Sequence, residues 1–215
     1  MTLQNRCMPD GSLVADAARG MFTGNRGGRF HDPVTKELRG RHWTNRRWIC
    51  CLTDFRGRSR QVMGNGYTEI FFLDEVTALA AGHRPCFECR NRDAKSFARA
   101  FVEGNPEAGN SADEMDRLIH AERRLTSGAR PQALSAIDLP GLPDGAMVEA
   151  AGRFYALKGR RALAWSFSGY GSPMPLGDLI SSAVTLVTPK PVLKALKAGY
   201  APVWHTSALQ PQSAQ

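Results

Sequence analysis

The sequence predicts an α+β protein: a small zinc-stabilised antiparallel meander with helices, followed by a small β-rich domain with a C-terminal helix. Short apolar runs bounded by Gly, Pro, Asn and Asp predict strands in both halves, and two segments after residue 90 repeat apolar residues at helical spacing. With 215 residues, 42% of them hydrophobic and 22% charged, the chain can bury one full core or two small ones.

The first half is predicted to begin with an arm and to continue as a meander. Residues 1–21 have no strong periodicity and are expected to form a loosely attached N-terminal arm. Turn-forming residues at 54–58 and 64–66 then separate short apolar runs. The predicted strands are Arg41–Thr53, Ser59–Met63 and Tyr67–Leu73.

A capped helix leads directly into a Cys-x-x-Cys motif. Asp74 is placed to cap a helix over Glu75–Ala81, and Gly82 suits the left-handed position after its last turn. Cys86 and Cys89 follow at the spacing of half a tetrahedral zinc site. We expect zinc rather than a redox pair, because a thioredoxin-like motif opens a helix and this one follows a helix. Unliganded structural cysteines are the remaining alternative.

A complete zinc site needs two further ligands from upstream. The candidates are His31, His42, His83, Cys50 and Cys51. The two cysteines belong to the apolar run Trp48–Leu52, which predicts a buried strand, and neighbouring residues of a strand point to opposite faces. Only one of them can therefore face the metal. We favour Cys51, which makes Cys50 a small buried hydrophobe.

The run from Phe71 to Cys89 resembles the metal-binding domain of Ada-type alkylation-repair proteins and the zinc modules attached to some bacterial nucleases. These modules share an aromatic strand and an Ala-Leu-x-Ala-Gly-aromatic-Arg-Pro-Cys-x-x-Cys segment, which this chain matches without a gap, with His83 at the aromatic position. Upstream, the residues from Gly24 to Pro33 resemble the start of the nuclease-linked version. The resemblance covers about residues 22–100, and it implies a zinc-binding domain whose first ligand is His31.

The second upstream ligand of the resembled modules is absent here. They carry a Cys four residues after the first ligand, where this chain has Thr35, which cannot replace a thiolate. The predicted ligand set is therefore His31, Cys51, Cys86 and Cys89. Four protein ligands leave no open position, so we expect a structural ion. In the Ada protein the first ligand is the cysteine that accepts a methyl group from a DNA phosphotriester, and His31 in that place makes stoichiometric methyl acceptance unexpected.

Two helices are predicted to end the zinc-binding domain, which spans residues 22–128. The first covers about 93–103, and the second covers 111–126 and opens with a capping box at Ser111. A β-rich domain is predicted over 129–215, with a helix that begins at Pro189. Its predicted strands are 147–151, 154–157, 161–166 and 183–187. The sequence of residues 195–205 is similar to that of residues 78–88. This similarity indicates either a degenerate duplication or simply a second helix with a Gly cap.

The net charge of +8 is concentrated at the N-terminus. Residues 1–60 contain twelve Lys or Arg against five Asp or Glu, and the rest of the chain contains sixteen against fifteen. Arginines interleaved with aromatic residues are typical of nucleic-acid-binding surfaces, whereas Trp48 is expected in the core. The candidate contact residues are Arg26, Arg29, Arg41, Trp43, Arg46, Arg47, Arg56 and Arg58. Another anionic partner, or solubility alone, is the alternative.

The chain is expected to be cytoplasmic and not to enter a membrane. No apolar run approaches eighteen residues, and residues 1–20 lack an apolar core followed by a cleavage site. Five cysteines, four of them near the predicted zinc site, fit a reducing compartment better than a disulfide framework.

Two functions are compatible with these patterns. The first is a zinc-binding protein that binds nucleic acid, DNA rather than RNA, with a role in DNA repair or processing. The second is an enzyme acting on nucleic acid, like a phosphodiesterase or nuclease, with its site in the C-terminal domain. A base and a cationic clamp for that enzyme could come from His120, Arg123 and His205. The sequence names neither a substrate nor an oligomeric state.

Overall fold

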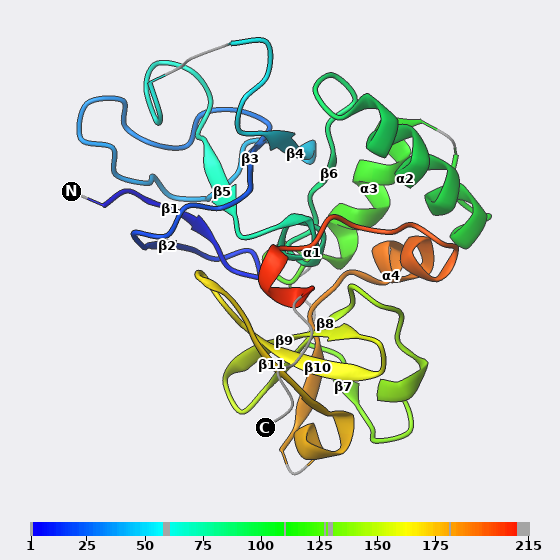
Figure 1. The fold of residues 1–215 in the computed structure, drawn as a ribbon. Coiled ribbons are helices and arrows are strands. Elements are labelled where there is room, and N and C mark those ends of the chain that lie inside the picture. The colour runs from blue at the N-terminus through cyan, green and yellow to red at the C-terminus, as the bar shows by residue number, and fades with distance from the viewer. Residues whose placement is uncertain are drawn as a thin grey trace.

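The protein has an α+β fold, as predicted. The computed structural model describes residues 2–57, 61–109, 111–126, 128, 131–180 and 182–209. Within this part of the chain, two six-stranded sheets are joined by four α-helices, with α1 between the sheets and α2 to α4 at one side (Figure 1). None of the described helices is both long and apolar enough to span a bilayer.

The first sheet has the strand order β2-β1-β5-β3-β4-β6. The predicted meander is recognisable in the antiparallel pairs of β3 with β4 and β5, but β1 pairs with β5 and β4 with β6 in parallel. The sheet is therefore mixed. Its strands are β1 (Gln4–Cys7), β2 (Leu13–Ala15), β3 (Phe22–Arg26), β4 (Trp48–Leu52), β5 (Ile70–Phe72) and β6 (Arg84–Pro85).

The N-terminal residues belong to this sheet, so the predicted loose arm over residues 1–21 is wrong. β1 and β2 pair with each other, and β1 also contacts β5. Asn5 and Cys7 are fully buried, and the Asn5 amide donates to the carbonyl of Glu69 at 3.2 Å. β1 has four residues, most of them polar, and β2 has only three, so neither strand is long enough to show a clear alternation of apolar and polar residues.

Two other strand predictions differ from the structure. The predicted strand over 41–53 forms only at β4, because residues 41–47 make bends in which Asn45 accepts from the Arg47 amide at 2.9 Å. The predicted strand over 59–63 lies partly outside the described residues. Its described part is a turn in which Met63 has a φ of 51°.

The helix caps agree with prediction. The helices are α1 (Glu75–Ala80), α2 (Asn91–Gly104), α3 (Ala112–Glu122) and α4 (Lys190–Lys197). Asp74 accepts from the Thr77 amide at 2.9 Å, Gly82 has a φ of 79°, and Ser111 accepts from the Glu114 amide at 3.2 Å. α3 ends before the predicted residue 126, because Arg123 turns to extended backbone and its side chain is buried.

The second sheet has the strand order β11-β10-β9-β8-β12-β7, with every pair antiparallel. β11 is absent from the predicted strands, because Pro173 and Pro175 are more typical of turns than of strand interiors. β11 lies at the edge of the sheet, where proline is tolerated. The strands are β7 (Ala133–Leu134), β8 (Met147–Ala150), β9 (Arg153–Lys158), β10 (Arg161–Ser166), β11 (Gly169–Pro175) and β12 (Val184–Leu186).

The apolar core does not divide at residue 128. One buried cluster joins Phe97 and Ile119 of α2 and α3 to Val148, Leu157 and Leu193 of the second half. The predicted boundary between 128 and 129 therefore separates two sheets but not two cores.

Buried carboxylates at the start of α1 also link the halves. Asp74 accepts from the Tyr170 hydroxyl at 2.9 Å and from the His205 amide at 3.0 Å. Glu75 accepts from the Tyr200 hydroxyl at 2.6 Å and pairs with Arg90 at 2.8 Å.

Candidate metal centre

The Cys-x-x-Cys turn is held against β4 by the backbone. β6 runs parallel to β4, and the Cys86 amide donates to the carbonyl of Cys50 at 3.0 Å. The turn carries Cys86 and Cys89 and leads into α2. β4 continues from Cys50 to Cys51, whose side chain points to the opposite face of the strand. This geometry brings Cys51 to the two cysteines of the turn.

Three cysteine sulfurs form the candidate metal centre. The Sγ atoms of Cys51, Cys86 and Cys89 all lie within 4.8 Å of one another. In a tetrahedral zinc site with Zn–S bonds of about 2.3 Å, the sulfurs lie about 3.8 Å apart, so small side-chain movements suffice to hold an ion. The Leu52 amide also donates to Cys89 Sγ at 3.4 Å. The residues present thus fit a thiophilic metal ion.

The three thiols of the cluster differ in the direction in which their pKa values are shifted. Hydrogen bonding from Cys51, together with the backbone amides of Cys89 and Glu88, lowers the pKa of Cys86 to about 5, against the effect of burial. The hydrogen bond from Cys51 also lowers the pKa of Cys89, while the pKa of Cys51 is raised by its bonds to both partners. The lowered pKa values of Cys86 and Cys89 favour the thiolate, which is the form that binds metal.

Cys50 occupies a different environment, in agreement with the preference for Cys51. It is fully buried, and its sulfur accepts from the Arg90 guanidinium at 3.5 Å. Burial raises the pKa of the Cys50 thiol well above its usual value. Cys50 therefore packs as a small apolar residue behind the strand.

His31, the fourth predicted ligand, is not brought into this group. Its Nδ1 lies 2.7 Å from the Thr68 hydroxyl and its Nε2 lies 2.9 Å from the carbonyl of Gly64. Both ring nitrogens are thus engaged in fixing the loop before β5. Among the described residues, no further His, Cys, Asp or Glu atom lies within 4.8 Å of all three sulfurs. The prediction of His31 as a ligand differs from the structure for this reason.

Arg26 is not available to a nucleic acid, contrary to prediction. It is fully buried, its guanidinium stacks 4.2 Å from the Trp48 ring centroid, and it donates to Gly11 O at 2.6 Å and to His83 Nε2 at 3.2 Å. Arg123 stacks on Trp48 as well, at 4.1 Å. Trp48 was predicted as a core residue, but no pattern in the sequence predicted that two arginines would be buried against its ring.

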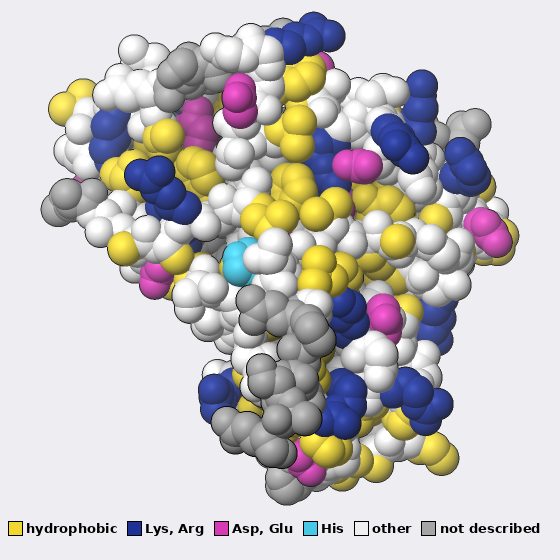
Figure 2. All heavy atoms as spheres, in the orientation of Figure 1, with side chains coloured by type: hydrophobic (Ala, Val, Ile, Leu, Met, Phe, Trp, Pro, Cys, Tyr) yellow, Lys and Arg dark blue, Asp and Glu magenta, His cyan; other side chains and the backbone are white. Residues whose placement is uncertain are grey.

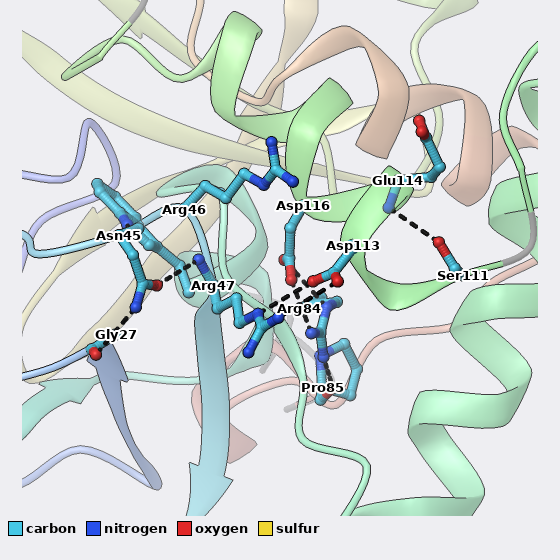
Figure 3. A network of polar contacts seen from close by, with 12 residues as sticks. Gly27, Asn45, Arg46, Arg47, Arg84, Pro85, Ser111, Asp113, Glu114 and Asp116 are labelled. Atoms are coloured by element: carbon cyan, nitrogen blue, oxygen red, sulfur yellow. Dashed lines mark hydrogen bonds and ion pairs between the residues drawn. The ribbon is translucent and has the colours of Figure 1, made fainter.

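The other predicted contact residues differ in their availability. Arg29, Arg41, Arg46 and Arg56 are exposed, whereas Arg58 lies outside the described residues. Arg47 is exposed but pairs with Asp113 at 3.0 Å; Figure 3 shows Arg47 and Arg84 pointing at the first turns of α3.

Trp43 is half-buried between Arg41 and His120. The Arg41 guanidinium lies 4.1 Å from its ring centroid, and the His120 ring meets it edge-on. On the face shown in Figure 2, Lys and Arg side chains are scattered rather than joined in one stripe. The positive charge on this face is therefore divided among small local groups of residues.

The predicted phosphodiesterase residues fall into two separate groups of contacts. His120 Nδ1 lies 2.8 Å from the guanidinium of Arg123, and burial lowers the pKa of His120. His205 Nδ1 instead lies 2.8 Å from the Ser207 hydroxyl, beside Asp74. Arg123 is also fully buried. This arrangement gives the enzyme hypothesis no support.

No protein-family model, curated protein or solved structure matches this chain.

Proposed function

We propose that the chain is a zinc-binding protein that binds nucleic acid, DNA rather than RNA, and acts in DNA repair or processing. The convergence of Cys51, Cys86 and Cys89 is the observation that carries this proposal. Three thiolates favour zinc among the divalent ions common in a reducing cytoplasm. The ion would link β4 to the turn before α2. The choice of DNA and of repair follows the resemblance to Ada-type modules.

The nucleic-acid surface that we propose consists of Arg41, Trp43 and Arg46. Two buried arginines support it from below: Arg26 donates to the carbonyl of His42 at 3.3 Å, and Arg123 donates to the carbonyl of Arg46 at 3.1 Å. Because these bonds hold the backbone of this segment in place, binding costs less conformational entropy for ordering its loop and side chains. Exposed guanidinium groups beside an indole provide phosphate contacts and a stacking face.

Binding can be measured by fluorescence anisotropy with labelled single- and double-stranded DNA and RNA over a range of salt concentrations. Arg46→Ala should reduce the slope of log affinity against log salt by about 0.7 to 0.9, the contribution of one phosphate contact. Trp43→Ala should cost roughly 1 to 3 kcal/mol of binding free energy and leave the slope nearly unchanged.

Lys197→Ala is the matched control, because Lys197 is exposed on α4, in the other half of the chain. It removes one positive charge outside the proposed surface. Equal effects of Arg46→Ala and Lys197→Ala would indicate attraction by net charge alone. No binding of the wild type at low salt would refute the nucleic-acid proposal and leave the metal proposal intact.

A further inference from the structure

The cysteine cluster supplies one ligand fewer than zinc normally takes. Zinc sites are almost always four-coordinate, and sites with three protein ligands keep the fourth position for water or another small molecule. Among the described residues only Cys51, Cys86 and Cys89 meet as metal ligands, and the ring nitrogens of His31 are engaged elsewhere. What lies in front of the three sulfurs therefore decides what the fourth ligand is.

The three cysteines line a cavity of about 230 Å³. Its walls include Thr23 and Asn25 of β3 and Phe71 of β5, so it lies over the solvent-facing side of the first sheet. Glu69 and Glu88 also line this cavity, which is called the metal end, so the three cysteines share it with two carboxylates. Glu69 is held in place, because its carboxylate accepts from the Met63 amide at 2.7 Å.

A second cavity, of about 730 Å³, adjoins the first. Both are lined by Thr53, Val62 and Phe71, so the two cavities meet at these side chains, and together they are called the groove. Arg6 and Arg19 line the far part and are absent from the metal end. The Arg6 guanidinium lies 4.9 Å from the Phe71 ring centroid, whereas Arg19 is exposed. The groove thus runs from thiolates and carboxylates, past apolar side chains, to guanidinium groups.

We propose that the metal takes its fourth ligand from outside the protein, and that this ligand is a small thiol carrying an acidic group. Its sulfur binds the metal, its carbon chain lies against Val62 and Phe71, and its acidic group is directed toward Arg19. On binding, the thiol releases its proton to solvent and replaces a metal-bound water. The inference rests on the metal binding proposed above.

The charges along the groove favour this orientation. A fourth thiolate completes a four-sulfur shell, which is a common and stable zinc environment. An acidic group at the metal end would meet Glu69, Glu88 and three thiolates, so repulsion directs it to the other end. There the guanidinium groups of Arg6 and Arg19 offer opposite charge.

Cobalt(II) loaded into the full-length chain provides the test, because sulfur-to-cobalt charge-transfer absorption reports the number of thiolates. We expect 3-mercaptopropionate to raise this absorption by about one third, as a fourth sulfur joins three. The neutral 3-mercapto-1-propanol should give the same final spectrum but bind about two- to fivefold more weakly, the range expected for an exposed ion pair. Protein-bound cobalt is counted throughout, so that metal loss is not taken for binding.

Two variants and one control variant locate the acidic group and exclude a protein ligand. Arg19→Gln should abolish the difference between the two thiols, while Arg153→Gln, an exposed arginine of the second sheet, should preserve it. His31→Gln should leave the cobalt spectrum unchanged without added thiol. A changed spectrum would show that His31 fills the fourth position and would overturn the proposal.

The remaining outcomes separate this inference from the proposed function. Charge-transfer bands that do not respond to either thiol would overturn the external ligand but leave metal binding standing. A chain without such bands would refute metal binding and this inference together. Equal affinity for both thiols in the wild type would overturn the assignment of an acidic ligand.

Discussion

Replacement of Asp74 by alanine tests how one buried carboxylate joins the two sheets. Asp74 is fully buried and accepts four hydrogen bonds: two from Thr77, one from the Tyr170 hydroxyl and one from the His205 amide. The first pair caps α1, and the other two fix the second half of the chain on it. Alanine removes all four acceptor contacts without offering a replacement.

The expected loss follows from these contacts. Loss of the helix cap costs about 1 kcal/mol. The hydroxyl of Tyr170 and the amide of His205 then lack their acceptor, at roughly 1 to 3 kcal/mol each. Relief from burying a charge offsets part of this cost, since burial raises the pKa of Asp74. We therefore expect Asp74→Ala to reduce the free energy of unfolding by roughly 3 to 5 kcal/mol.

Urea unfolding followed by circular dichroism and tryptophan fluorescence measures this loss. Tyr170→Phe is the matched control, because it removes one donor and leaves the cap intact; it should cost roughly 1 to 2 kcal/mol. Trp48 and Trp165 lie in different sheets, so coincident transitions would also show that the halves unfold together. A loss below about 1 kcal/mol for Asp74→Ala, or one equal to that of Tyr170→Phe, would refute the reasoning.

Three further predictions concern the metal, the pH and the cysteine chemistry. The purified chain should bind one zinc ion, measured by atomic emission, with binding lost in Cys86→Ser and kept in Cys50→Ala; zinc retained by Cys86→Ser would place the site elsewhere. Burial holds the pKa of His83 well below its usual value, so the folded state excludes a proton that the unfolded state binds below about pH 6.5. The free energy of unfolding should therefore fall as the pH drops from about 6.5 to 5, by at most about 1.4 kcal/mol per pH unit for this group. The fall should be less steep in His83→Gln. Equal dependence of the free energy on pH in the two proteins, measured by urea unfolding, would contradict the assignment. Incubation with DNA carrying methylphosphotriesters should leave the protein mass unchanged, whereas a gain of one methyl group, located by mass spectrometry, would show that a cysteine of the cluster is the acceptor.

Local signals in the sequence were sufficient for some of this structure. Asp74, Gly82 and Ser111 each act through neighbours within a few residues, so the helix ends were predictable from them. Alternation along a strand likewise separated Cys50 from Cys51.

Other features depend on contacts between distant residues. The burial of Arg26 requires Gly11, Trp48 and His83 to surround it, and no local pattern announces such an arrangement. His31 is engaged by Thr68 and Gly64, more than thirty residues along the chain. The meeting of the strand and turn cysteines was therefore predictable, whereas the separate position of the histidine was not.

The position of β11 has a consequence for how copies of this chain can meet. An exposed sheet edge invites pairing with a strand of another molecule, and natural sheets avoid this with prolines and very short edge strands. Pro173 and Pro175 deprive β11 of two amide donors, and β7 at the opposite edge has only two residues, Ala133–Leu134. Both edges of the second sheet thus carry features that disfavour strand addition, so this sheet is expected to resist growth into an intermolecular sheet at high protein concentration.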